Sequence, residues 1–467
     1  MRIIGRFLGI VLFFGTWVIA QVPGEPELWR YALVDISATG PAVLNEIKQH
    51  PGLAWWVELE DRLLVRVDRL GFRELADRFS IERIPAVVDD RRLAFAGLPL
   101  APELGQPLVL VRGGRFAVVQ LPTREPFDFE ETFGKDDREY CGHGVVLPFR
   151  PDTVLARVAA NWEPSPNFQK RETVQDFVDQ LDIDRWFADV YYLHCINRYA
   201  RGDEVSDATW WLLEQFRNLG LPAATQRFEF SGVLGDNVIA VLEGTDRPDD
   251  WYIVGAHYDS RAESHELSLV SAPGAEDNGS GTAAVLEMAR LFSQNPPQAT
   301  MLFICFSGEE QGLFGSRHHA DSLLDEGNGG KIKAALIMDM IGFTADDDLD
   351  CLLETGESSE PLLTPFIDAA AAYTNLRIVT SLNPFGSDHV PYLQRGMPAL
   401  LVIENDWNIY PSYHRTTDLA ENISLEMGAE VLKMNLAVMA ELAGIPGLIQ
   451  SVSESESDLI PAMDGHR

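Results

Sequence analysis

The sequence contains few cysteines, and their spacing excludes one common kind of metal site. Four cysteines are spread over 467 residues, and none has the paired spacing of a thiolate zinc site. If the chain binds a metal, its ligands are therefore expected among histidine and carboxylate side chains.

Basic residues are scarce relative to acidic ones. Lys and Arg number 37 against 71 Asp and Glu, which gives a formal net charge of -34. A field of this sign repels nucleic acid and anionic membrane surfaces, so no partner of either kind is expected. The acids are scattered along the chain, which favours a role in solubility over the attraction of cationic substrates.

Long apolar runs are almost absent, and the exception lies at the N-terminus. Arg2 and Arg6 precede an apolar run from Phe7 to Ala20, a pattern typical of an export signal. The run is short for a membrane span, although an uncleaved anchor is the alternative. We therefore expect residues 1–20 to be a signal peptide and the mature protein to be secreted or periplasmic.

The apolar content and the length indicate a folded chain with more than one domain. Hydrophobic residues make up 46% of the sequence, which is enough for a sizeable core, and the length favours two domains. From residue 27 to about residue 95, the pattern predicts strand, helix, strand, strand, helix and strand, the last at Ile84 to Val88. This predicts an N-terminal α/β domain with a linker over residues 27–150.

A second domain is expected over residues 155–445. Its strand-like runs are almost wholly apolar, as they are where helices cover both faces of a sheet. Two helices are predicted before these strands, the first from Thr173 to Tyr199; further helices are predicted between the strands, and one from Ser424 to Ala443 closes the domain. The fold class is therefore α/β, with a mixed, largely parallel sheet sandwiched by helices. The Ser- and Glu-rich residues 451–467 are expected to form a disordered tail.

Polar side chains follow several of the apolar runs, at the strand ends where ligands collect in such sheets. Each of them alone is more often a helix cap or a solvated loop residue. Several carboxylates and imidazoles at one rim would be costly to bury unless a cation were present. At these strand ends lie His257, Asp259, Glu309, Glu310, Asp339 and Glu404, and two loop or helix-start sites add Asp277 and His414.

Imidazole and carboxylate ligands without thiolate suit zinc, cobalt or manganese, whereas calcium prefers oxygen ligands alone. Two histidines and three carboxylates can hold two metals if one carboxylate bridges them, and paired metals activate a water. Proton transfer then needs a carboxylate that is not a ligand. The adjacent Glu309 and Glu310 can divide these two tasks.

Five segments resemble the zinc exopeptidase family of secreted bacterial leucyl aminopeptidases, peptidase family M28, which also contains glutamate carboxypeptidases and glutaminyl cyclases. The resemblance covers roughly residues 190 to 445. The segments are Val254 to Ser260 (VGAHYDS), Ala275 to Gly281 (AEDNGSG), Phe306 to Gly315 (FSGEEQGLFG), Met338 to Gly342 (MDMIG) and Tyr413 to Asp418 (YHRTTD).

The resemblance implies two Zn²⁺ ions, with Co²⁺ or Mn²⁺ as substitutes, and a role for each residue. It implies that the bridging Asp277 is followed by a cis peptide bond, that Glu309 is the general base and that Asp259 orients His257. The remaining implied ligands are His257 and Asp339 for one metal, and Glu310 and His414 for the other.

The activity implied is that of an aminopeptidase acting on peptides with a free N-terminus, by attack of a hydroxide held between the metals. One alternative is a glutaminyl cyclase, although Tyr413 stands where the cyclases are expected to have tryptophan. Others are a carboxypeptidase, for which no arginine cluster is evident, and a receptor-like ectodomain without activity. The N-terminal domain resembles the small propeptide domains of proteases and is interpreted either as such a propeptide or as a permanent accessory domain.

Overall fold

The computed structural model describes residues 29–97, 100, 106–113, 116–122, 146–158, 165–166, 168–346, 348–384 and 386–445. The predicted signal peptide (1–20) and the predicted acidic tail (451–467) lie outside the described residues. Among the helices that are described, none has both the length and the apolar character that crossing a membrane requires.

The N-terminal part contains six elements of the expected types in the expected order, although the last strand lies earlier in the sequence than predicted. They are β1 (Arg30–Asp35), α1 (Pro41–Lys48), β2 (Leu53–Leu59), β3 (Arg62–Val67), α2 (Arg69–Ala76) and β4 (Ile81–Arg83). The strands pair antiparallel in the order β2-β3-β1-β4. The prediction of a strand at Ile84 to Val88 is wrong, because pairing with β1 ends at Arg83 and Pro85 has no N–H to donate to a ladder.

Four further strands form a separate small sheet, which was not predicted from the sequence. They are β5 (Leu93–Gly97), β6 (Leu108–Gly113), β7 (Phe116–Gln120) and β8 (Val146–Pro148), and they pair antiparallel in the order β6-β7-β5-β8. Phe95 and Phe116 of this sheet share a buried core with Val57 and Leu59 of β2. The two sheets therefore pack face to face, while α1 and α2 contribute Leu44, Ile47 and Leu75 to a second core with β1 and β3.

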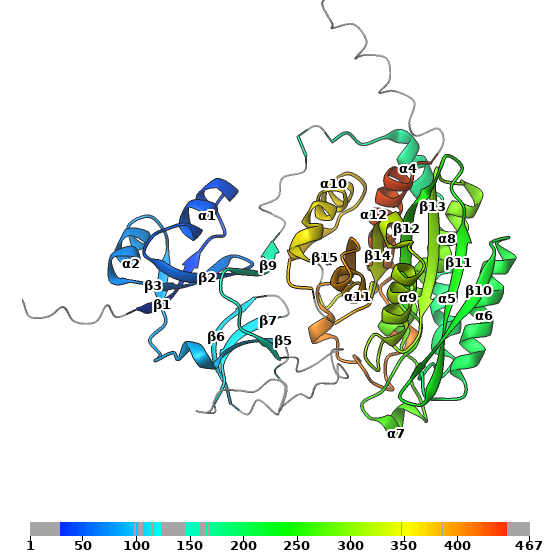
Figure 1. Cartoon of the computed structure of the whole chain (residues 1–467), viewed down its shortest axis with the longest axis horizontal. Coiled ribbons are helices and arrows are strands. Elements are labelled where there is room, and N and C mark those ends of the chain that lie inside the picture. Colours follow the sequence, from blue (N-terminus) through cyan, green and yellow to red (C-terminus); the bar gives the residue numbers. More distant parts are fainter. Residues whose placement is uncertain are drawn as a thin grey trace, which may run out of the picture.

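The remaining strands build the large sheet that carries the candidate site. In sheet order they are β10 (Ala223–Phe230), β11 (Val233–Leu242), β13 (Ala299–Phe306), β12 (Arg247–His257), β14 (Ile332–Met338), β17 (Ala399–Glu404), β15 (Asp350–Glu354) and β16 (Arg377–Ser381). Strand β12 runs parallel to β13 and β14, and β14 runs parallel to β17. The pairs β10–β11, β11–β13 and β15–β17 are antiparallel, so the sheet is mixed, as predicted. Strand β9 (Thr153–Val158) pairs with both β16 and β2 and so extends this sheet into the N-terminal part. Figure 1 shows β9 between β2 and β15.

Helices cover both faces of the large sheet, because alternate residues of its central strands face opposite cores. Met301, Phe303 and Cys305 of β13 belong to the core that contains α8 (Gly281–Gln294) and α12 (Leu425–Ala443). Leu302, Ile304 and Phe306 belong to the core beneath α9 (Phe314–Asp325) and α11 (Val390–Gln394). The other helices are α4 (Glu172–Val178), α5 (Ile183–His194), α6 (Val205–Asn218), α7 (His265–Ser268) and α10 (Leu363–Tyr373).

The single helix predicted from Thr173 to Tyr199 is wrong, because this segment forms two helices. The side chain of Asp182 accepts a hydrogen bond from the N–H of Arg185 at 3.0 Å and caps a new N-terminus there. The helix α4 therefore ends at Val178, and α5 begins at Ile183.

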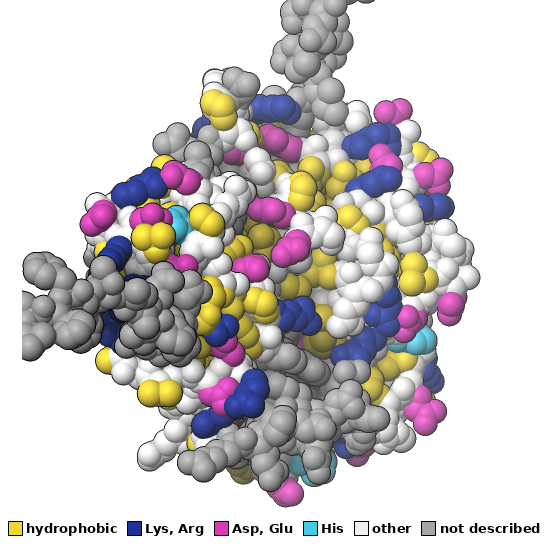
Figure 2. Space-filling view, turned by 60° about the vertical axis from the view of Figure 1, so that its left-hand side comes forward, with side chains coloured by type: hydrophobic (Ala, Val, Ile, Leu, Met, Phe, Trp, Pro, Cys, Tyr) yellow, Lys and Arg dark blue, Asp and Glu magenta, His cyan; other side chains and the backbone are white. Residues whose placement is uncertain are grey.

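The charges on the face drawn in Figure 2 are interspersed rather than gathered. On the face drawn in Figure 2, acidic and basic side chains alternate around apolar ones, although the whole chain has a net charge of -34. This agrees with a role of the acidic residues in solubility.

Candidate metal centre

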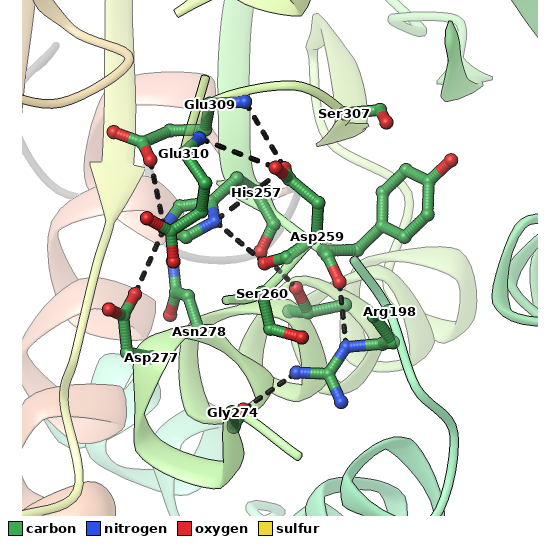
Figure 3. A network of polar contacts seen from close by, with 12 residues as sticks. Arg198, His257, Asp259, Ser260, Gly274, Asp277, Asn278, Ser307, Glu309 and Glu310 are labelled. Atoms are coloured by element: carbon green, nitrogen blue, oxygen red, sulfur yellow. Dashed lines mark hydrogen bonds and ion pairs between the residues drawn. The ribbon is translucent and has the colours of Figure 1, made fainter. Parts of the chain in front are cut away.

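Three neighbouring parallel strands bring four of the predicted site residues to one edge of the sheet. His257 is the last residue of β12, Asp339 directly follows β14, and Glu309 and Glu310 lie just after β13. Because β13, β12 and β14 are adjacent and parallel, their carboxyl ends coincide. Figure 3 shows His257, Glu309 and Glu310 turned toward the same space.

Asp277 enters this space from a distorted turn before α8. The turn spans Ala275–Ser280, and its peptide bond between Asp277 and Asn278 is cis, which confirms that expectation. Oδ1 of Asp277 lies 3.4 Å from Nε2 of His257, and Oδ2 lies 3.0 Å from Nε2 of His414. The carboxylate of Asp277 thus lies between two imidazoles and presents one oxygen to each.

Each imidazole also faces a second carboxylate. Nε2 of His257 lies 3.3 Å from Oδ1 of Asp339, and Nε2 of His414 lies 3.1 Å from Oε2 of Glu310. Two groups of ligand atoms, each within 4.8 Å of one another, could hold an ion: one from His257, Glu309 and Asp339, the other from Asp277, Glu310 and His414. The structure therefore brings together all five predicted ligands and the predicted base.

The buried carboxylates of this site fit a cation. Within the described residues, both oxygens of the Glu310 side chain are shielded from solvent and neither accepts a hydrogen bond, although Oε2 faces Nε2 of His414 at 3.1 Å. A buried carboxylate left in this way is costly, and coordination of a metal removes that cost. The donor set of two imidazoles and several carboxylates is one that zinc accepts.

The electrostatics of the site also show an excess of negative charge. Burial alone would lower the pKa of the His257 imidazole, but the facing Glu309 and Asp339 carboxylates raise this pKa well above its usual value. Burial raises the pKa of the Glu309 carboxyl well above its ordinary range, and Glu310 and Asp388 add to this effect while His257 opposes it. A cation at this position would relieve both the desolvation and the repulsion.

Asp259 contacts its neighbours differently from what its expected role suggests. Nδ1 of His257 lies 3.1 Å from the backbone carbonyl oxygen of Asp259, whereas the nearest carboxylate oxygen of Asp259 is 3.8 Å away. That carboxylate instead accepts hydrogen bonds from the backbone N–H groups of Glu309 at 3.2 Å and Glu310 at 3.3 Å (Figure 3). Asp259 therefore fixes the turn that carries both glutamates and supports His257 mainly through its main chain.

Two residues to which the sequence gave no role position the candidate ligands. Asp418 accepts hydrogen bonds from the N–H groups of Glu276 and Asp277, at 2.9 and 3.0 Å. Ser387 donates from Oγ to Oδ2 of Asp339 at 2.6 Å. The only signal for Asp418 was its place at the end of the motif that contains His414.

Arg198 holds the loop that leads to Asp277. Its guanidinium is fully buried and donates to the carbonyl oxygens of Tyr258 at 2.7 Å, Pro273 at 2.7 Å and Gly274 at 2.6 Å (Figure 3). These bonds tie the two ends of the long loop between β12 and the Asp277 turn to one side chain.

The sequence matches known peptidases over the part that carries this site. The model of peptidase family M28 matches residues 237–439. A probable leucine aminopeptidase of Arthroderma otae is 31% identical over 265 residues, which cover 54% of this chain and 70% of the relative. A probable aminopeptidase of Saccharomyces cerevisiae is 27% identical over 352 residues, or 72% of this chain and 93% of the relative. The chain spans only 59% of a probable zinc metalloprotease of Leptosphaeria maculans, at 29% identity over 46% of this chain.

Solved structures share the fold. LapB from Legionella pneumophila superposes with a TM-score of 0.54 at 19% identity, over 75% of this chain and 99% of LapB. BSAP, a zinc aminopeptidase from Bacillus subtilis, gives a TM-score of 0.50 at 18% identity, over 56% of this chain and 95% of BSAP. The solved structures show the shared fold, and the family model together with the sequence relatives establishes that the chain belongs to peptidase family M28.

Proposed function

We propose that this chain is a zinc-dependent aminopeptidase that removes N-terminal residues from peptides through a centre of two metal ions. One observation carries the proposal. The Asp277 carboxylate directs one oxygen to each of two buried imidazoles, which is the arrangement that a ligand bridging two metals requires. The names of the relatives, which include a probable leucine aminopeptidase and probable zinc metalloproteases, support the activity and the metal.

In this proposal, His257 and Asp339 hold one zinc, and Glu310 and His414 hold the other. The short distances between Nε2 of His257 and Asp339, and between Nε2 of His414 and Glu310, support this pairing. Asp277 contributes one oxygen to each ion. Asp418 and Ser387 keep the Asp277 turn and the Asp339 carboxylate in place.

Glu309 is proposed as the base, although it lies close enough to His257 and Asp339 to be a ligand. Oε2 of Glu309 is 3.9 Å from Nε2 of His257, whereas Asp277 and Asp339 approach the same atom to 3.4 and 3.3 Å. These distances favour Asp277 and Asp339 as the ligands and leave Glu309 beside them.

When bound, the two zinc ions polarise the scissile carbonyl and lower the pKa of a water at the site. Glu309 accepts the proton of the attacking water and delivers it to the leaving amine. Asp259 keeps Glu309 in reach by accepting the two backbone N–H bonds of its turn. The low exposure of Glu309, about 2%, keeps bulk water away from the carboxyl during both transfers.

Two measurements test the proposal. Hydrolysis of leucine p-nitroanilide is expected, and hydrolysis of its N-acetylated form is not, because the substrate is proposed to need a free amine. Equal cleavage of both would refute the aminopeptidase assignment, and cyclisation of an N-terminal glutamine without hydrolysis would favour the glutaminyl cyclase alternative. Glu309→Gln is expected to lower kcat by about 10²–10⁴-fold while the zinc content stays unchanged, since a general base contributes that much and is not a ligand.

We also propose that the protein is exported, since Arg2, Arg6 and the apolar run that ends at Ala20 support a cleavable signal. N-terminal sequencing of the protein recovered from the cell exterior tests this. A mature chain that begins close after Ala20 is expected. A chain that still carries the apolar run and stays with the membrane would show the uncleaved anchor instead.

A further inference from the structure

The N-terminal part and the large sheet share one strand. Strand β9 pairs in parallel with β2, where Val57 lies opposite Thr153 and Glu58 opposite Val154. The same strand pairs antiparallel with β16, where Val379 lies opposite Val158 and Thr380 opposite Arg157. Because β9 has a partner on each side, the two parts are joined by a continuous run of strand pairing.

The N-terminal core holds β9 through a buried side chain. Leu155 is fully buried and belongs to the same core as Val57, Leu59 and Phe95. The N–H of Asp152, just before β9, donates to the carbonyl oxygen of Trp56 at 2.8 Å. The position of β9 therefore depends on the folded N-terminal part.

On its other side, β9 covers a strand that would otherwise be at the edge of the sheet. Strand β16 pairs with β15 along one side, and β9 is its partner on the other. The hydroxyl of Ser381, at the end of β16, donates to the carbonyl oxygen of Leu155 at 2.7 Å. Its Oγ also accepts the N–H of Asn383 at 3.2 Å. Ser381 thus ties the chain leaving β16 to the backbone of β9.

The chain that leaves β16 leads directly to the metal centre. Ser387, a few residues after Ser381, donates to Oδ2 of Asp339. A shift of the segment from Ser381 to Ser387 would change the orientation of the Asp339 carboxylate, which is a ligand in the proposed function. Described contacts therefore join the N-terminal core to Ser381 through Leu155, and Ser387 to this ligand, while Ser381 and Ser387 are linked along the chain.

We propose that the described part of residues 29–158 is a permanent support of the metal centre, which orders Ser381 and Ser387 through β9, and not an inhibitory propeptide whose removal activates the enzyme. The claim that this support affects a metal ligand, Asp339, rests on the proposed function. The claim that β9 orders Ser381 and Ser387 does not. Ser381 is a positioning residue in this proposal, because it contacts neither the metal nor the substrate.

The first test cuts the chain between the N-terminal part and the large-sheet part without changing the described sequence of either. A protease site is placed between residues 159 and 164, after β9, and the purified full chain is cleaved there. The fragments are expected to co-elute, with turnover of leucine p-nitroanilide and zinc content kept within twofold. Removal of the N-terminal fragment in mild denaturant, followed by return to buffer, is expected to lower turnover at least tenfold. It is also expected to speed amide hydrogen exchange in residues 381–387.

Turnover that is unchanged or higher after the N-terminal fragment is removed would overturn the proposal. So would unchanged hydrogen exchange in residues 381–387. The exchange measurement needs no peptidase activity, so it still decides the proposal if the chain proves to have another function.

A pair of variants tests the Ser381 contact in the intact chain. Ser381→Ala is expected to speed exchange in residues 381–387 and to weaken zinc binding several-fold, and Ser381→Thr is expected to restore both. The matched control is Thr300→Val, which removes another buried hydroxyl; like that of Ser381, it donates to a carbonyl oxygen, that of Pro248 at 2.9 Å, and accepts a backbone N–H, that of Gly244 at 3.0 Å. Equal effects of Ser381→Ala and Thr300→Val on zinc binding would contradict the proposed route.

Discussion

Asp418 offers a quantitative test of how the metal-binding loops are held together. Its Oδ1 accepts hydrogen bonds from the N–H of Glu276 and the hydroxyl of Tyr410, at 2.9 and 2.7 Å, and its Oδ2 accepts the N–H of Asp277 at 3.0 Å. Asp418 also follows His414 closely in the chain. One buried side chain therefore joins the loops that carry two of the proposed ligands.

Asp418→Asn keeps the shape of this side chain but replaces one acceptor oxygen with a donating amide. The remaining oxygen is expected to stay with Glu276 and Tyr410, where it keeps two of the three bonds, so the amide then faces the N–H of Asp277. A buried N–H that has lost its acceptor costs about 1–3 kcal/mol. At about 1.4 kcal/mol per factor of ten, zinc binding should weaken roughly 5- to 150-fold.

The assay is competition for zinc against a chromophoric chelator, with circular dichroism to show that the variant is folded. The matched control is Asp368→Asn, because Asp368 is also buried and accepts a backbone N–H, that of Ser165 at 2.7 Å, but lies on α10 and contacts none of the proposed ligands. The control is expected to bind zinc as the unchanged chain does. Zinc affinity of Asp418→Asn equal to that of the unchanged chain would refute the claim that Asp418 positions Asp277.

Three further outcomes are expected. Trp186→Ala should lower the free energy of unfolding by about 3–5 kcal/mol, since Trp186 is fully buried and its Nε1 donates to the carbonyl oxygen of Ser280. Trp210→Ala should change this free energy by less than about 0.5 kcal/mol, because Trp210 is 66% exposed. Chemical denaturation measures both, and equal losses would contradict the described packing. Chelation should abolish peptide hydrolysis, and added Zn²⁺ or Co²⁺ should restore it; full activity in the metal-free protein would contradict a metal-dependent mechanism. Ser387→Ala should weaken zinc binding about 10–100-fold, as loss of a partner of a ligating carboxylate commonly does, and unchanged affinity would show that Asp339 needs no such support.

The sequence predicted the parts of the molecule that depend on local pattern. The apolar runs before His257 and Asp339 are buried strands of a largely parallel region, so their carboxyl ends had to meet, and the structure places both residues there. The family and the α/β fold, both inferred from such motifs, are confirmed. The roles of the individual ligands remain predictions that the geometry supports.

Strands outside the central parallel run of the large sheet were missed because their sequence patterns are weak. Strand β10 is an edge strand whose buried residues are few, so its sequence AATQRFEF lacks an apolar run. Strands β15 and β16 have five residues each, which is too short to show a clear alternation of apolar and polar side chains. The contacts of Asp418 and Asp259 were also missed, since they join segments far apart in sequence and use backbone N–H groups that every residue has.

The most direct test of the central claim is the number of zinc ions bound per chain at saturation, measured in the unchanged chain and in Asp277→Asn. The bridging position of Asp277 predicts two zinc ions in the unchanged chain and weaker binding of both after the substitution, because each imidazole faces a different oxygen of this carboxylate. One zinc ion per chain, or two that Asp277→Asn leaves equally tight, would contradict the account.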